Sequence, residues 1–276
     1  MLVLGGCGDD AAHEPPDAST PDAPSTLAVT IDFAAKIGGE AFACGQTYDA
    51  IGSAGSAYVA SDFRFYVHDV RLVGDGGTFA VELDEGPFQA GGVALLDFET
   101  GGAGCQMGST STHTAITGTV PAGTYTGIVF KVGVPFAQNH LDVAAANPPL
   151  DVPAMYWAWS SGYKFVKIDG AVGGAGFNLH VGSTGCGTTG TTPPGAPCAS
   201  PNVAEIELAG FSPGTSVIVA DIAPVLADVD VSVNTADTAP GCMSFPGDPE
   251  CVTIFPKLGL PYGDTPAGAQ RLFTVE

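Results

Sequence analysis

The sequence predicts an all-β protein: a single antiparallel β-sandwich with long loops that disulfides hold closed. Composition is the first reason, because glycine (39) and proline (22) are abundant and charged residues make up only 13% of the 276 residues. Long amphipathic helices need many Glu, Lys, Arg and Leu residues, whereas short strands joined by turns suit this composition better. The second reason is that apolar runs alternate with turn clusters along the chain, without a repeat of fixed period.

The individual strands are indicated by alternation and by the turn signals between them. The clearest case is the segment 124–134, where alternate residues share one parity: Thr126, Ile128, Phe130, Val132 and Val134. Only the segment 135–146 indicates a short helix or an irregular loop. Strands are expected in the segments 27–34, 62–73, 78–83, 93–98, 112–120, 124–134, 163–169, 176–182, 203–208, 216–222 and 228–233.

Three parts of the chain are distinguished by composition. Residues 1–7 end in Leu-Gly-Gly-Cys, which resembles a lipobox, so this part is expected to be the remnant of a lipoprotein signal with lipid on Cys7. An ordinary disordered terminus is the alternative. Residues 8–26 are rich in Pro, Asp, Ala and Ser and are expected to form a disordered tether. Residues 27–276 contain no second linker and are expected to form one domain.

Six cysteines remain after Cys7, an even number that favours disulfides in an exported chain. Two short loops rich in Gly and Pro are expected to be closed locally, by Cys186–Cys198 and by Cys242–Cys251. By subtraction, Cys44 and Cys105 are expected to form the third pair. A zinc site is the rival interpretation, but the chain has no pair of cysteines at CxxC spacing.

Charge and motifs exclude several function classes. The formal net charge of −21 disfavours binding to nucleic acid, because the protein would repel the phosphates. The sequence has no G-x-S-x-G elbow, no H-E-x-x-H helix, no P-loop and no G-x-G-x-x-G fingerprint that leads from a strand into a helix. No pair of carboxylates stands out as a glycosidase site.

Histidine and tryptophan are the residues that remain for chemistry. His180 is expected to project from the face of its strand opposite Phe177 and Leu179, beside Gly182, although a surface histidine would fit the same pattern. His140 follows a strand, either as a ligand or as a turn residue, and His68 is interpreted as a packed histidine.

Trp157 and Trp159 are the only tryptophans of the chain and lie one residue apart. Neutral imidazole suits copper or zinc, and the thioether of the nearby Met155 would favour Cu(I). An unmodified indole is a poor ligand because its nitrogen carries a proton. An aromatic cluster beneath a loop is therefore the alternative for the two tryptophans.

Six segments together resemble the MbnP-like family of exported bacterial proteins, including its four-Cys branch. The likeness covers the chain from Leu27 to the C-terminus. It is carried by DFRFYVHDVRLV, VALLDFETG, GVPFAQNHLD, PLDVPAMYWAWSSGYKFVKIDG, FNLHVGSTGC and GCMSFPGDPEC.

The resemblance implies a periplasmic or cell-surface copper protein that is paired with an MbnH-type dihaem peroxidase. That partner opens a tryptophan to kynurenine, here Trp157 or Trp159, and copper is then bound by the kynurenine and two histidines. By position the histidines are His140 and His180, with His68 either incidental or an extra ligand. The four-Cys label matches Cys186, Cys198, Cys242 and Cys251.

The leading hypothesis is thus a lipid-anchored outer-membrane copper protein, not itself an enzyme, that binds Cu(I) and contacts the membrane only through its lipid. One tryptophan is expected to be partly accessible beside the histidines, and the other to pack beneath it. A metal-free β-sandwich module that binds glycan or protein is the runner-up. A sandwich stabilised by calcium on surface aspartates is the third reading. The sequence leaves open which tryptophan is modified, whether copper is stored, delivered or sensed, and the oligomeric state.

Overall fold

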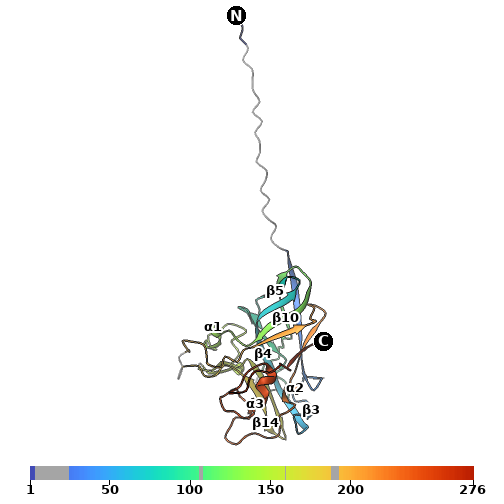
Figure 1. Cartoon of the computed structure of the whole chain (residues 1–276), viewed down its shortest axis with the longest axis vertical. Coiled ribbons are helices and arrows are strands. Elements are labelled where there is room, and N and C mark those ends of the chain that lie inside the picture. Colours follow the sequence, from blue (N-terminus) through green and yellow to red (C-terminus); the bar gives the residue numbers. More distant parts are fainter. Residues whose placement is uncertain (4–24, 106–107, 159, 188–192) are drawn as a thin grey trace.

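Two β-sheets pack face to face in a computed structural model of the chain (Figure 1). The structure describes residues 1–3, 25–105, 108–158, 160–187 and 193–276. Aromatic rings from both sheets meet between the layers. Phe33 of the first sheet contacts Phe65 and Phe130 of the second edge to face, at ring-centroid distances of 6.0 and 5.8 Å. The predicted all-β sandwich is confirmed.

The first sheet has the strand order β19-β17-β1-β9-β6, with β2 paired to β1. Its longest strand alternates buried and exposed side chains, as a half-buried strand should. The strands are β1 (Thr26–Ile37), β2 (Glu40–Ala41), β6 (Glu82–Leu83), β9 (Ala115–Pro121), β17 (Val217–Asp221) and β19 (Phe273–Val275).

The second sheet is organised around one long strand, β4 (Ser56–Gly74), in the order β16-β10-β4-β13-β15-β18. β4 also pairs with β3, β5 and β8, and smaller strands extend the sheet. The remaining strands are β3 (Thr47–Ile51), β5 (Gly77–Ala80), β7 (Gln89–Ala90), β8 (Val93–Asp97), β10 (Tyr125–Val132), β13 (Val166–Val172), β14 (Ala175–Gly176), β15 (Asn178–Val181), β16 (Ala204–Ala209) and β18 (Gly241–Cys242).

Most strand pairs are antiparallel, as expected, but β1–β17 and β15–β18 are parallel, so both sheets are mixed. Two expected strands also differ in the structure. The segment 78–83 is divided between the two sheets as β5 and β6. The segment 228–233 is not a strand, because Asp230 accepts hydrogen bonds from the backbone and hydroxyl of Ser232 and closes a turn.

Helical segments are short, which agrees with the composition. They are α1 (Phe136–Asn139), α2 (Ala223–Leu226), α3 (Cys251–Ile254) and the 3₁₀ turns η1 (Pro153–Met155) and η2 (Phe255–Leu258). Among the described residues, no helix has the length and apolar character needed to cross a bilayer.

A second hydrophobic cluster lies on the outer face of the second sheet, away from the sandwich core. The chain from α1 to the small hairpin of β11 (Tyr156–Ala158) and β12 (Gly162–Tyr163) folds over this face. The hydroxyl groups of Tyr66 and Tyr163 donate to the carbonyls of Pro149 and Leu150 and hold the segment down. The buried members are Tyr66, Val93, Leu95, Val134, Leu150, Met155, Tyr163 and Phe165. Leu150 and Met155, in the proline-containing segment before the tryptophans, are buried because they join this cluster.

All three predicted disulfides are present: Cys44–Cys105, Cys186–Cys198 and Cys242–Cys251. The last two close short loops beside β15, where they replace the packing that Gly- and Pro-rich sequence cannot supply. Cys7, and the tether apart from residues 25 and 26, lie outside the described residues.

Candidate metal centre

His180 lies on β15 with its side chain on the outer face of the second sheet. Its neighbours Leu179 and Val181 point into the sandwich core, so the alternation inferred from the sequence is present. His180 is only 7% exposed, however, and is therefore not a surface histidine. The chain segments that cover the outer face bury it.

The two ring nitrogens of His180 have different surroundings. Nε2 lies 2.5 Å from Oδ1 of Asp169 on the neighbouring strand β13. Nδ1 is buried and has no hydrogen-bond partner among the residues that the structure describes. A carboxylate can only accept, so a neutral imidazole that bonds it through Nε2 would carry its proton there and present a lone pair at Nδ1. This arrangement is the one that metal-binding histidines use, with a carboxylate fixing the ring from behind.

Burial keeps this imidazole in its metal-binding form. Removal from water lowers the pKa of His180, and the opposing effect of Asp169 does not cancel it. For Asp169, burial acts to raise the pKa, but His180 and Lys167 hold it below its ordinary value. The pair therefore consists of a neutral imidazole and a carboxylate near neutral pH.

Trp157 lies beside His180, with ring centroids 6.2 Å apart, and beside Phe245, with ring centroids 5.8 Å apart. Gly182 makes this approach possible, because a Cβ there would lie 2.5 Å from Cζ3 of the indole. Trp157, which is half-buried, thus occupies the space beside Gly182. Trp159 lies outside the described residues.

His140 follows α1 and is 4% exposed. The preceding Asn139 accepts a hydrogen bond from the backbone of Tyr163 and donates one to Ser183, three residues after His180. These bonds bring His140 into the region where β15 ends. His140 Nε2 also lies 3.5 Å from Sγ of Cys198, and a ring nitrogen of His140 lies within 4.8 Å of Sγ of Cys186. The two sulfurs form a disulfide and offer no thiolate.

His68 lies further along β4, where it pairs with Val93 of β8. The register places Arg64 two strands away from His180, and His68 is four residues beyond Arg64. With a strand spacing of about 4.8 Å and a rise of about 3.3 Å per residue, His68 is about 16 Å from His180. One metal ion cannot bind both.

A row of buried charges crosses the outer face next to His180, and it was not singled out from the sequence. The register aligns His180 of β15 with Lys167 of β13, Arg64 of β4 and Asp97 of β8. Asp62 joins the row by bonding both Arg64 and Lys167. The sequence signal for this row is the alternation of charged residues with core residues in SDFRFYV and KFVKIDG.

Asp97 is the member of this row with a strongly raised pKa. Burial raises the pKa to about 6, against the lowering effect of Arg64. Because the folded protein then holds the proton more tightly than the unfolded chain, Asp97 contributes stability below about pH 4 that is lost as the pH rises through 6.

We therefore compare the unfolding free energy of Asp97→Asn with that of the natural protein at two pH values. The substitution should raise this free energy more, or lower it less, at pH 7 than at pH 4. An Asn oxygen can still accept the bond from the Glu99 backbone that Asp97 now accepts. Urea denaturation of both proteins at the two pH values measures the difference in unfolding free energy. An equal difference at both pH values would contradict the assignment.

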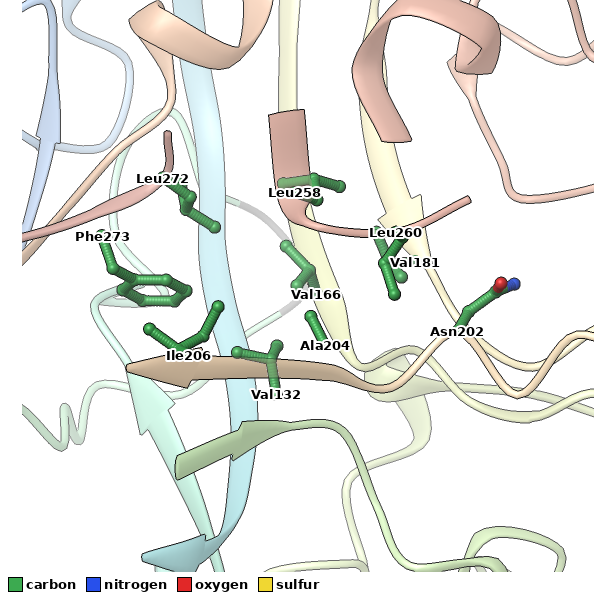
Figure 2. Close-up of a pocket in the computed structure, with 10 residues that line it drawn as sticks. All are labelled: Val132, Val166, Val181, Asn202, Ala204, Ile206, Leu258, Leu260, Leu272 and Phe273. Atoms are coloured by element: carbon green, nitrogen blue, oxygen red, sulfur yellow. The ribbon is translucent and has the colours of Figure 1, made fainter. Parts of the chain in front are cut away.

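An apolar cavity of about 10 Å³ lies elsewhere, between the second sheet and the C-terminal segment (Figure 2). Its walls are aliphatic and aromatic side chains from β10, β13, β15, β16 and residues 258–273. The amide of Asn202 at its edge already donates to the carbonyl of Gly182. The cavity has no metal-binding groups and belongs to the core.

The comparisons with known proteins agree on one family. The model of the MbnP family matches residues 26–244. Among solved structures, MbnP from Methylosinus trichosporium is similar, with a TM-score of 0.81 and 31% sequence identity over 91% of this chain and 98% of that chain. No curated protein matches the chain.

Proposed function

The chain belongs to the MbnP family, and on this premise we propose that it is an exported copper-binding protein, without catalytic activity of its own, whose site uses a modified tryptophan. Membership of the MbnP family confirms the resemblance seen in the sequence motifs. It supports a role related to copper in general terms. The observation that carries the proposal is the buried, unpartnered Nδ1 of His180 beside Trp157.

The chemistry of the site explains why a tryptophan must change before it can bind. Oxidative cleavage breaks the C2–C3 bond of the indole and adds one oxygen atom to each carbon, while two molecules of hydrogen peroxide are reduced to water. Hydrolysis then releases C2 as formate and leaves an aryl amine next to a ketone. The aryl amine has an available lone pair, which the indole nitrogen lacks.

The proposed oxidant is a dihaem peroxidase of the MbnH type that docks on this protein. An electron must leave the tryptophan although the haem stays in the partner, so the ring must lie near the surface. Trp157 is half-buried and reaches the outer face over Gly182, which suits this requirement. We therefore assign Trp157 as the modified residue.

The proposed ligands are His180 through Nδ1, the amine derived from Trp157, and His140. Imidazole suits copper, and an aryl amine adds a nitrogen ligand of intermediate softness, so we propose copper as Cu(I). Asp169 fixes the His180 ring, and Asn139 holds the chain next to His140. The protein is proposed to reside in the periplasm or at the cell surface, attached through lipid on Cys7.

The test is to express the protein with and without the peroxidase, followed by peptide mapping and copper analysis. We expect kynurenine and stoichiometric copper only after co-expression. His180→Ala should fold and still be modified, yet lose the copper, because a ligand is removed from the face opposite the core.

His68→Ala is the matched control, since it removes a histidine about 16 Å from His180 by strand register. It should retain copper. A His180→Ala protein with full copper occupancy would remove this residue from the site. Absence of both kynurenine and copper after co-expression would favour a metal-free binding module.

A further inference from the structure

We propose that Asp169 is a positioning residue that fixes His180 in the tautomer with its proton on Nε2, and that Lys167 and Asp62 hold Asp169 in this role. The importance for copper rests on the proposed function. The position of the proton, in contrast, is a property of the metal-free protein and can be tested without any metal.

Both oxygens of the Asp169 carboxylate are occupied. Oδ1 lies 2.5 Å from Nε2 of His180, and Oδ2 accepts from Nζ of Lys167 at 2.5 Å. A carboxylate with a free oxygen could turn toward a metal ion and become a ligand itself. Here each oxygen already has a donor, so Asp169 supports the histidine and leaves the metal to Nδ1.

The support continues into the centre of the sheet. Lys167 also bonds Asp62, and Asp62 in turn accepts from Nε of Arg64 at 2.8 Å. Asp62, Arg64 and Lys167 are at most 4% exposed. Buried ions must be paired, so each member restricts the next one.

The backbone keeps these groups in register. Asp169 is opposite Asp62, and Lys167 is opposite both Arg64 and His180, on the adjacent strands β13, β4 and β15. A site supported by paired strands is held more precisely than one on loops. The row therefore does more than neutralise charge, because it determines which histidine nitrogen is free.

Asp169→Asn is the decisive variant. An amide NH₂ and an ammonium group are both donors, so the amide oxygen should face Lys167 and the amide NH₂ should face His180. Nε2 must then accept a hydrogen bond, and the proton moves to Nδ1. The lone pair that is proposed to bind copper is lost, although the side chain keeps nearly the same shape.

The experiment uses ¹⁵N-histidine-labelled, metal-free protein and nitrogen–proton correlation NMR at neutral pH to locate the proton of His180. We expect Nε2–H in the natural protein and Nδ1–H in Asp169→Asn. Copper affinity after co-expression with the peroxidase should fall about 10- to 100-fold in the variant, the range typical of lost support behind a metal-bound histidine. Glu205→Gln, which alters an exposed ion pair with Arg71, should change neither quantity.

Two results would overturn the proposal: Nδ1–H in the natural protein, or unchanged tautomer and copper affinity in Asp169→Asn. The position of the His180 proton is measured in the natural protein itself. The proposal can therefore be tested even if Asp169→Asn fails to fold. If the natural protein binds no copper but the tautomers are as expected, the proposed function fails and the positioning by Asp169 stands.

Discussion

Trp157→Phe is expected to abolish stoichiometric copper binding while the protein remains folded. Phenylalanine keeps an apolar ring against Gly182 and Phe245 but cannot be opened to an aryl amine. Since the proposed site then has only imidazole ligands, copper should be lost during gel filtration. Copper content and peptide mapping after co-expression with the peroxidase measure both consequences.

Trp159→Phe is the matched control, because it removes the other tryptophan from the same segment. This variant should still contain kynurenine at position 157 and should retain copper. Kynurenine found at position 159 in the natural protein would show that the assignment to Trp157 is wrong. The modified ligand of the proposed copper site would then be derived from Trp159.

Asp62→Ala is expected to cause the largest loss of stability. Asp62 is 1% exposed and bonds both Arg64 and Lys167, so its removal leaves Arg64, also 1% exposed, without its bonded carboxylate. Removing one partner of a buried ion pair costs about 3–5 kcal/mol, because the remaining charge is still desolvated. Urea denaturation with the disulfides intact measures the change.

Glu205→Ala provides the comparison at the surface. Its carboxylate bonds Arg71 at 2.9 Å but is 56% exposed, and such pairs contribute about 0–1 kcal/mol. A similarly small loss for Asp62→Ala would mean that water or a rearranged Asp169 compensates Arg64 and Lys167. The row would then be less rigid than its burial indicates.

Local patterns in the sequence were sufficient to predict the fold class and the two disulfides that close short loops. Alternating apolar residues predicted the strands β1 and β10, because successive side chains of a strand point to opposite faces. β1 is half-buried as expected, whereas β10 is buried along most of both faces. The same alternation placed His180 on the face opposite the core. Cys186–Cys198 and Cys242–Cys251 could be predicted because each closes a short loop that cannot pack by itself.

The surroundings of His180 were decided only by the tertiary structure. Trp157 reaches His180 because the 136–163 segment folds over the outer face of the sheet and Gly182 leaves room for the indole. Asp169 and Lys167 meet Asp62 because β13 pairs with β4 in one particular register. A shift by one residue would send these charges into the sandwich core, so the register is fixed by the burial of the apolar residues that alternate with them on the same strands. The sequence by itself determined which residues could take part in the site, and the packing of distant strands determined which of them meet.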